Sequence, residues 1–473
     1  MSAIRNELVI AANQRAIALM DYDIHNDVDK RQEFIQQTIL SDKSLTNDEK
    51  SEAIRITNKK YDRYKIRYNE GKKRICENCQ EECLATLYCE YCIKNYLKSN
   101  FLNWTSGNND IDDLIQKCQM EFLSPYKIVE WIPYSNLQNI KYLTKGGFSE
   151  IYTADWIGGE YYEWNSNELQ LKRYGTNKVI LKILDNVENA NRSWFDEAKY
   201  HLIIFNKWGD IVQCYGLSQD PSNGNYMLVM KQLDINLGEY LQHNHNQLTW
   251  NERIKIIAEI IQGLNRIHNE NAIHRDLHSG NILYSQYKNY WYISDLGFCG
   301  PADKPLGSIY GNLPYIAPEV IVGKRYTFAS DVYSIAMLMW EISSGQPPFA
   351  NYENDYNLAM NIVNGMRPKI VSGTPLKYKE LVEQCWDSDP TKRPDINTLY
   401  FEIRKINKLC HEQQSYTNTN INNIQSNVIR NFNSKIYDFK DLPEPRNATK
   451  DEYNNPNLHS EDQNKLEIPE GNG

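Results

Sequence analysis

Long hydrophobic runs are missing from this 473-residue chain. No uninterrupted apolar stretch approaches the roughly 18 residues that a membrane-spanning helix needs, so a membrane partner is not expected. Residues 1–21 contain Glu7 and lack the unbroken apolar centre of a signal peptide. We therefore expect an intracellular protein, located in the cytoplasm with the nucleus as the alternative.

An excess of positive charge is also missing. The formal net charge is −9 at pH 7, so the chain as a whole has no electrostatic affinity for nucleic acid. The segment 50–74 is an exception, with ten Lys or Arg residues against three acidic ones. It belongs to a helix predicted to begin at a capping box of Thr46 and Glu49 and to end near Glu70, with Gly71 following. A solvated helix face is the simpler interpretation of these charges, and a nucleic-acid or acidic partner is the alternative.

Cysteines are few, ten in all, yet four of them share one short stretch. Cys76 and Cys79 form one Cys-x-x-Cys pair, Cys89 and Cys92 form another, and nine residues separate the pairs. Four thiolates at this spacing are typical of tetrahedral Zn²⁺, and such a site is structural because no position stays open for water. Cys83 lies between the pairs and is an alternative ligand. Disulfides or free buried thiols are the competing interpretations, and disulfides are disfavoured in an intracellular protein.

The chemistry of the chain is indicated by three short segments in a fixed order. His274-Arg275-Asp276 begins a stretch that ends at Asn281, and Asp295-Leu296-Gly297 and Ala317-Pro318-Glu319 follow it. Phosphoryl transfer to a hydroxyl requires a carboxylate that orients the hydroxyl and accepts its proton. It also requires oxygen ligands for Mg²⁺. The segments supply residue types of both kinds.

Over about residues 137–409 the chain resembles the eukaryotic protein kinases, and its details are similar to the tyrosine-kinase-like group. The resemblance implies that Asp276 is the catalytic carboxylate and that Asn281 and Asp295 bind Mg²⁺. Lys182 would then steady the α- and β-phosphates of ATP. Glu197, fifteen residues further on, would hold Lys182 through an ion pair.

Further contacts with ATP are implied in the phosphate loop and the hinge. These residues are Gly146, Gly147, Ile151, Lys182, Met230, Lys231, Leu233, Asn281 and Asp295. Met230 matches the family's gatekeeper, although an ordinary buried methionine is equally compatible with its position. Thr144 and Ser149 replace the outer glycines of the family's G-x-G-x-x-G loop, and only the central one is kept, at Gly146. The backbone comes closest to phosphate at the central position, so the retained Gly146 should still allow closure over ATP. Loss of the two outer glycines should weaken that closure.

The catalytic loop departs from the family pattern at His278. Serine/threonine kinases usually carry a lysine there that contacts the transferring phosphate, and a partly neutral imidazole would stabilise that charge less well. Asn312 stands where these kinases usually have Thr, and Gly280 does not supply the arginine of tyrosine kinases. Ser or Thr of a protein substrate is therefore the expected acceptor. The alternative is a pseudokinase scaffold that binds a protein partner at the zinc module.

Two more matches predict structural braces. Asp331 should support the catalytic loop, and Arg393 should pair with Glu319. The segment 158–166 looks like an insertion rich in aromatic residues. It either docks a partner or is a surface loop without a role.

The expected fold class is α+β: a two-lobed kinase domain at 137–409 with a strand-rich small lobe and a helical large lobe. A helical region at 1–74, a zinc-binding module at 75–100 and a linker at 101–136 should precede it.

The remaining residues, 410–473, form a tail that is rich in asparagine and poor in large apolar residues. Such a composition predicts disorder. Within this tail, Ile436–Phe439 is the candidate for a short docking segment.

Overall fold

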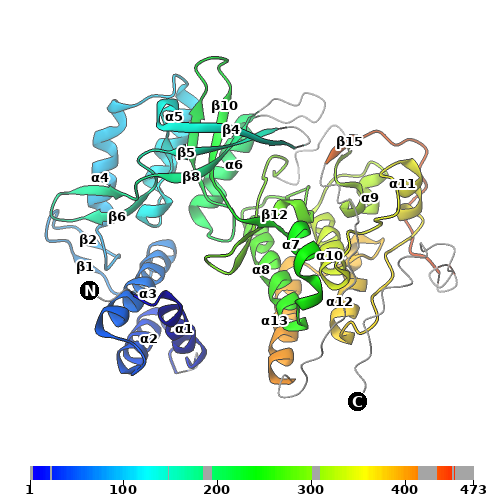
Figure 1. The fold of residues 1–473 in the computed structure, drawn as a ribbon, viewed down its shortest axis with the longest axis horizontal. Helices are drawn as coiled ribbons and strands as arrows, with labels where there is room; N and C mark the ends of the chain where they lie inside the picture. Colours follow the sequence, from blue (N-terminus) through cyan, green and yellow to red (C-terminus); the bar gives the residue numbers. More distant parts are fainter. Residues whose placement is uncertain are drawn as a thin grey trace. The chain divides into compact units, whose positions relative to one another are not determined.

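The computed structural model describes residues 4–21, 24–146, 149–184, 194–300, 309–413, 434–449 and 452. The chain divides into two compact units (Figure 1). The first comprises Met1–Gln138, Asp155–Asn177 and Tyr215–Gln219, and the second comprises Asn139–Ala154, Lys178–Cys214 and Asp220–Gly473. Among the described residues, no helix combines the length and apolarity required to cross a membrane.

The first unit begins with three helices and continues with short strands and helices. Its elements are α1 (Asn6–Ala18), α2 (Val28–Ser41), α3 (Asn47–Tyr68), β1 (Arg74–Ile75), β2 (Glu82–Cys83), α4 (Glu90–Asn100), η1 (Phe101–Asn103), α5 (Asn109–Met120), η2 (Pro125–Lys127), β3 (Glu130–Trp131), η3 (Tyr134–Asn136), β6 (Tyr161–Asn165), β7 (Gln170–Arg173) and most of β9 (Cys214–Gln219). Strand β3 pairs in parallel with β9, and β6 and β7 form an antiparallel hairpin.

Helix α3 begins as the sequence predicts. The Thr46 hydroxyl accepts the N–H of Glu49, and the Glu49 carboxylate accepts the N–H of Thr46, which confirms the capping box. The helix ends at Asn69, whose left-handed φ of 51° replaces the expected role of Gly71.

One face of this basic helix holds the cysteine-rich loop. Asp62 is fully buried, and its carboxylate accepts the N–H groups of Thr86 at 2.7 Å and Leu87 at 2.9 Å. The face that carries Asp62 is therefore packed, so the interpretation of α3 as a solvated helix applies only to its other faces.

The expected domain boundaries need correction in the first unit. The stretch 101–136, expected as a linker, contains helix α5, strand β3 and three 3₁₀ turns. The predicted insertion is the hairpin β6–β7, and it packs onto α4 because Trp164 and Leu171 are buried in one cluster with Ile93 and Leu97. The hairpin therefore belongs to the first compact unit, together with the cysteine-rich loop.

The second unit contains a sheet followed by a helical region. Its elements are most of β4 (Leu137–Lys145), most of β5 (Glu150–Trp156), most of β8 (Asn177–Ile183), α6 (Trp194–Lys207), β10 (Tyr226–Lys231), β11 (Ile235–Asn236), α7 (Leu237–Asn244), η5 (His245–Gln247), α8 (Trp250–Asn269), η6 (Ser279–Asn281), β12 (Ile282–Ser285), β13 (Tyr290–Ile293), β14 (Ile309–Gly311), η7 (Leu313–Tyr315), α9 (Pro318–Ile321), α10 (Phe328–Ser344), α11 (Tyr356–Val363), α12 (Leu376–Cys385), η8 (Pro390–Lys392), α13 (Ile396–Gln413) and β15 (Lys435–Tyr437). The strand order in its sheet is β10-β8-β5-β4. The α+β class and the helices before the kinase-like region are confirmed.

Helices α8 and α10 form the centre of the helical region. Helix α8 begins with a capping box of Thr249 and Glu252 and buries Ile254, Ile257 and Ile261 along one face. Helix α10 is apolar on nearly all sides and is buried over almost its whole length. It ends at Gly345, which has a φ of 73°, a conformation that glycine adopts readily. A central, fully packed helix gives the neighbouring loops a rigid support.

The prediction of a disordered tail is corrected for residues 434–449. Strand β15 pairs antiparallel with β14, and the side chains of Tyr437, Phe439 and Leu442 pack against the core of the second unit. Burial of these three apolar side chains offsets the entropy cost of ordering a polar tail. The segment Ile436–Phe439, predicted to dock, lies within this ordered part.

Candidate active site

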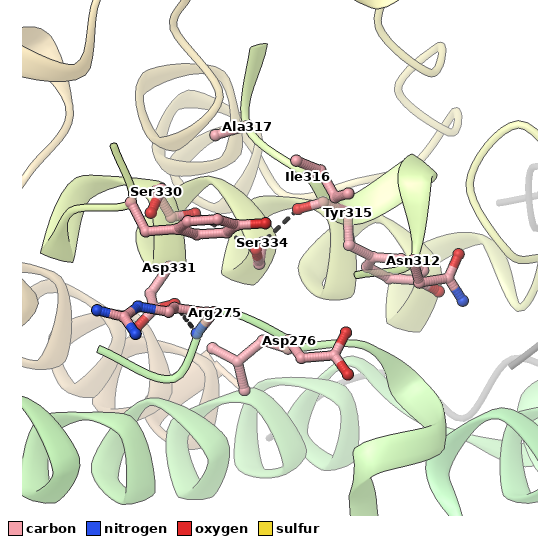
Figure 2. A pocket seen from close by; sticks show the side chains of 11 residues that line it. Arg275, Asp276, Asn312, Tyr315, Ile316, Ala317, Ser330, Asp331 and Ser334 are labelled. Atoms are coloured by element: carbon pink, nitrogen blue, oxygen red, sulfur yellow. Dashed lines mark hydrogen bonds between the residues drawn. The ribbon is translucent and has the colours of Figure 1, made fainter. Parts of the chain in front are cut away.

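The segment from His274 to Asn281 is supported by Asp331 of helix α10. The buried Asp331 carboxylate accepts the backbone N–H of His274 at 2.8 Å and of Arg275 at 2.9 Å. Arg275 has a φ of 70°, which is uncommon for a residue other than glycine, and these bonds help to hold it. Figure 2 shows the side chains of Arg275 and Asp276 pointing in opposite directions. The predicted brace is confirmed, and it fixes the direction of the Asp276 carboxylate.

Asp276 is buried, with only 5% of its surface exposed. Burial and, secondarily, the negative charge of Asp295 raise the pKa of Asp276 to about 6. At neutral pH the carboxylate is therefore mostly ionised, yet it binds a proton more readily than an exposed aspartate does. The side-chain amide of Asn281 donates to the Asp276 carbonyl at 2.9 Å, so these two predicted site residues are in contact.

Lys182 of β8 lies between two carboxylates. Its ammonium is 2.7 Å from Glu197 of α6 and 2.5 Å from Asp295. Only 7% of the Lys182 side chain and none of the Glu197 side chain is exposed, so the predicted ion pair is confirmed and is shielded from water. A buried ammonium is tolerated only when it is paired, and here two carboxylates provide the pairing.

The oxygens of Asn281 and Asp295 are suitable ligands for Mg²⁺, since this hard cation prefers carboxylate and amide oxygens. A second cluster, Glu197, His201 and Asp295, also brings possible ligand atoms within 4.8 Å of one another. There, however, Nε2 of His201 accepts the N–H of Leu296 at 3.1 Å, and Glu197 is paired with Lys182. We assign no metal ion to that cluster.

His278 is neutral, because burial lowers its pKa to about 4. Its Nδ1 accepts the N–H of Gly280 at 3.2 Å, which assigns the ring proton to Nε2. Nε2 lies 3.9 Å from the Asp276 carboxylate. The imidazole can therefore donate one hydrogen bond beside Asp276, but it brings no positive charge there.

The residues predicted to contact ATP lie at the ends of strands. The N–H of Gly146 donates to the Ser149 carbonyl at 2.8 Å, which closes the end of the turn between β4 and β5; Gly147 lies outside the described residues. Ile151 is on β5. Met230 is the penultimate residue of β10, and its side chain is buried, which agrees with both interpretations of this residue.

The hinge continues from β10 through Lys231 and Leu233, both partly exposed. The N–H of Lys231 donates to the carbonyl of Gln213 at 2.8 Å. This bond fixes the end of β10 where the predicted adenine contacts begin.

The second predicted brace is also confirmed. Two nitrogens of the Arg393 guanidinium contact the two carboxylate oxygens of Glu319, each at 2.7 Å. Arg393 also donates to the carbonyl of Ala329, in the first turn of α10. This bidentate pair ties the segment around Ala317-Pro318-Glu319 to the helical core.

Comparison with known families agrees with this geometry. Residues 137–403, more than half of the chain, match the family of protein tyrosine and serine/threonine kinases. The chain belongs to this protein kinase family. The strand-rich region with Lys182 and the helical region with Asp276 are thus parts of one kinase domain.

Curated relatives of this kinase include enzymes from distant eukaryotes. The probable serine/threonine-protein kinase roco7 of Dictyostelium discoideum is 26% identical over 59% of this chain and 10% of its own length. The dual specificity protein kinase zakA of the same organism is 31% identical over 42% of this chain and 27% of its own. The human dual serine/threonine and tyrosine protein kinase is 32% identical over 41% of this chain and 21% of its own. The kinase chain therefore matches only about a quarter or less of each relative's length.

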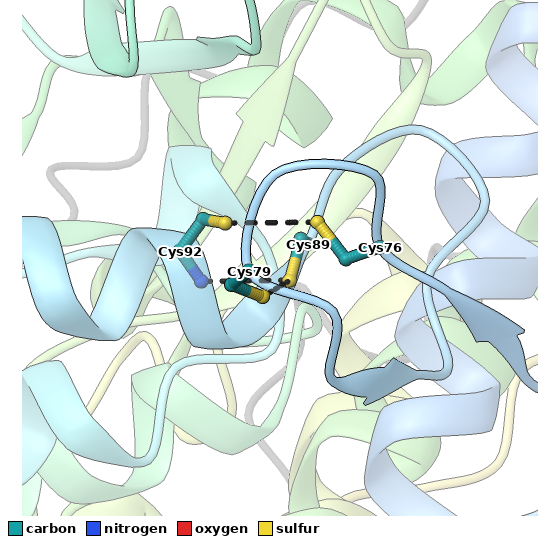
Figure 3. Close-up of side chains that lie close together, drawn as sticks. All are labelled: Cys76, Cys79, Cys89 and Cys92. Atoms are coloured by element: carbon teal, nitrogen blue, oxygen red, sulfur yellow. Dashed lines mark hydrogen bonds between the residues drawn. The ribbon is translucent and has the colours of Figure 1, made fainter.

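The four thiols of the predicted metal site lie together in the first unit of the kinase (Figure 3). Their sulfur atoms are all within 4.8 Å of one another, with 3.7 Å between Cys76 and Cys92 and 3.6 Å between Cys79 and Cys89. Zn–S bonds of about 2.3 Å in a tetrahedron place the sulfurs about 3.8 Å apart. The observed spacing fits this value and exceeds the roughly 2.05 Å of a disulfide. Cys83 is buried nearby but is outside the group of four.

One residue beside Asp276, Ser434, belongs to no motif that would identify it from sequence. Its hydroxyl donates to the Asp276 carboxylate at 2.8 Å and lies 3.4 Å from Nε2 of His278. Ser434 directly precedes β15 and is 158 residues from Asp276 in the chain. A signal was present only indirectly, in the short apolar segment that follows it.

Proposed function

We propose that this kinase transfers the γ-phosphoryl group of ATP, with Mg²⁺, to serine or threonine residues of proteins, in the cytoplasm or nucleus. The observation that carries the proposal is the contact of the buried Lys182 ammonium with Glu197, which is buried, and with Asp295, which is partly exposed. Apolar side chains of similar volume would stabilise the fold at least as well as a buried ammonium between two carboxylates. Stability alone therefore does not explain this arrangement. It is suited to holding phosphates and a metal ion.

Each residue has a distinct proposed role. Lys182 binds the α- and β-phosphates, and Glu197 keeps Lys182 in place. Asn281 and Asp295 hold Mg²⁺, which supplies charge that offsets the phosphates. Asp276 accepts the hydrogen bond of the incoming hydroxyl and then its proton, for which its raised pKa is suitable.

Several ATP contacts are proposed from position alone. Gly146 and Gly147 would cover the phosphates, Ile151 and Met230 would contact the adenine ring, and the backbone of Lys231 and Leu233 would bind its edge. The buried Ser149 at an outer glycine position makes this cover stiffer. A slow enzyme is therefore expected.

Preference for Ser or Thr is supported by the depth of the site. Ser434 reaches Asp276 while its neighbours Lys435–Tyr437 pair with β14. A tyrosine hydroxyl stands a phenyl ring further from the backbone and would not fit the same pairing. The relatives named above include serine/threonine and dual-specificity kinases, and the motif details support the tyrosine-kinase-like group.

We further propose that Cys76, Cys79, Cys89 and Cys92 hold one structural Zn²⁺, and that the resulting module offers a surface to a protein partner. The sulfur spacing supports the ion. The alternative function, a pseudokinase scaffold acting through this module, is favoured by His278, which is neutral where the family's lysine is charged.

A radiolabelled ATP assay with matched serine, threonine and tyrosine peptides tests the proposed function. Label in the serine or threonine peptides, lost in Lys182→Met, is the expected result. A chain that binds Mg·ATP but labels no peptide would support the scaffold instead.

A further inference from the structure

Strand β15 occupies the place of an extended peptide beside Asp276. It pairs antiparallel with β14, with Ile309 opposite Tyr437, Tyr310 opposite Ile436 and Gly311 opposite Lys435. Gly311 has a φ of 135°, and a Cβ built there would lie 3.4 Å from the Asp276 carboxylate. Strand β14 thus runs close to Asp276 at Gly311, and β15 brings Ser434 to the same point. Addition of a strand is a common way for a protein to bind a peptide.

The hydroxyl of Ser434 has both of the contacts that an acceptor needs. Its proton points to Asp276 at 2.8 Å, and its oxygen lies 3.4 Å from Nε2 of His278, the nitrogen that carries the ring proton. Ser434 is 5% exposed, so water competes little for these contacts. Oriented hydrogen bonds of this kind place a nucleophile for reaction.

Contacts further along the tail hold the segment in place. Tyr437 stacks on Phe439, and Phe439 meets Tyr356 edge-on. The N–H of Arg446 donates to the Val363 carbonyl at 3.0 Å, and the Asn447 side chain accepts the N–H of Ser388 at 2.9 Å.

A close backbone approach adds to these contacts. A Cβ built on Gly365 would lie 2.2 Å from the backbone nitrogen of Ala448. The tail therefore passes directly over Gly365. These contacts anchor the segment that carries Ser434 to the second unit.

We propose that residues 434–449 are an intramolecular substrate of this kinase and that Ser434 is its autophosphorylation site. This inference rests on the proposed function. The Ser434 oxygen attacks the γ-phosphorus of ATP, forming a P–O bond, while the bond from that phosphorus to the β,γ-bridging oxygen breaks. Its electron pair leaves with ADP, and the Ser434 proton passes to Asp276 and then to water.

Phosphorylation should also release the segment. A phosphoserine carries a charge of about −1.5 to −2, and it would stand beside the carboxylates of Asp276 and Asp295. Repulsion between these charges should separate β15 from β14. The active site then becomes open to other protein substrates.

The test uses the full chain after phosphatase treatment. Mg·ATP is added, and mass spectrometry follows phosphate on Ser434 while a serine peptide reports transfer to a second molecule. We expect phosphorylation of Ser434 to be first-order, with a rate constant that does not depend on protein concentration. Peptide phosphorylation should begin after a lag, and the length of this lag should match the half-time of Ser434 phosphorylation. A mass-tagged Asp276→Asn chain mixed with wild type should remain unmodified at Ser434.

Two tail variants make the test specific. Tyr437→Ala removes a buried anchor and should slow Ser434 phosphorylation by about 10-fold or more. Lys440→Ala is the matched control, because its side chain is 79% exposed, and it should leave the rate unchanged.

Different failures have different meanings. Peptide phosphorylation without phosphate on Ser434 would overturn the intramolecular substrate and leave the proposed function intact. Equal labelling of the Asp276→Asn chain would show transfer between molecules and overturn it as well. If neither Ser434 nor the peptide is labelled, the proposed function fails and this inference falls with it.

Discussion

The cysteine module and the helical region of the kinase domain each hold an irregular loop in a fixed conformation, but they do so with different kinds of contact. The loop from Cys76 to Cys92 carries the four clustered thiols, and its backbone N–H groups are bound by the buried Asp62 carboxylate. The loop from His274 to Asn281 rests on Asp331, which projects from a helix inside a large apolar core. Where apolar burial is abundant, a single carboxylate is enough to hold the loop in its conformation. Where apolar burial is scarce, polar contacts such as those of Asp62, together with the proposed zinc ion, would supply the stability.

Removal of metal should separate the two regions most strongly. Zinc-finger peptides gain about 10–16 kcal/mol from their ion at neutral pH, so a chelator should unfold residues 74–100 and leave the helical region folded. Metal analysis should find one zinc per chain, lost in Cys79→Ser and Cys92→Ser. Cys83→Ser is the matched control and should keep the metal. Unchanged hydrogen exchange of residues 74–100 in metal-free protein would contradict the comparison.

Breaking the brace in the helical region should have the next largest effect. Arg393→Ala leaves the buried Glu319 carboxylate unpaired, which costs about 3–5 kcal/mol of unfolding free energy. Chemical denaturation of the full chain measures this loss. Lys392→Ala changes the exposed neighbouring residue and should cost little. Equal effects of the two variants would show that the buried pair does not stabilise this region.

The hairpin β6–β7 should stabilise the first unit alone. Trp164 is 6% exposed and packs with residues of α4, so Trp164→Ala should cost about 3 kcal/mol there. Hydrogen exchange should increase in α4 while α10 stays protected. Tyr174→Ala, at a position that is 69% exposed, serves as the control. Faster exchange in α10 as well would mean that the two regions unfold together.

A smaller effect is expected from pH in the helical region. Burial raises the pKa of Glu259 from 4.5 to about 7, because its neutral form is favoured in the folded protein. The stabilisation that comes from the protonated Glu259 is fully present below pH 4.5, the pKa of this carboxyl in the unfolded chain. It is lost as the pH rises through about 7, the pKa in the folded protein.

Replacement of this carboxyl tests the pH effect. Glu259→Gln keeps an acceptor for the N–H of Trp291, which Glu259 binds at 3.0 Å. It should therefore exceed wild type in stability by about 1 kcal/mol at about pH 8, with no gain at about pH 4. The exposed Glu383→Gln should show no such trend. A gain that is independent of pH would assign the effect to something other than ionisation.

The sequence predicted best those features that depend on a short motif. Asp331 and Arg393 were identified as braces because their neighbours match a family pattern, and the capping box at Thr46 follows from two residues three positions apart. Helix α3 ends at Tyr68, two residues before the expected Glu70, because Asn69 adopts the left-handed conformation before Gly71 does.

Features that depend on distant packing were not predictable. The hairpin looked like a surface insertion, since nothing local shows that Trp164 meets α4. The tail looked disordered because its composition is polar, and β15 has only three residues, too few for a pattern of alternation. The contact of Ser434 with Asp276 depends on that pairing and so could not be seen from sequence.

The most direct test of the kinase assignment is the behaviour of Asp276→Asn. In the proposed mechanism Asp276 acts on the incoming hydroxyl, whereas Lys182 and Asp295 act on ATP and Mg²⁺. Asp276→Asn should therefore bind Mg·ATP about as well as wild type while its rate of peptide phosphorylation falls by about 100-fold or more. A variant that transfers phosphate at the wild-type rate, measured in parallel on the same peptide, would contradict the account.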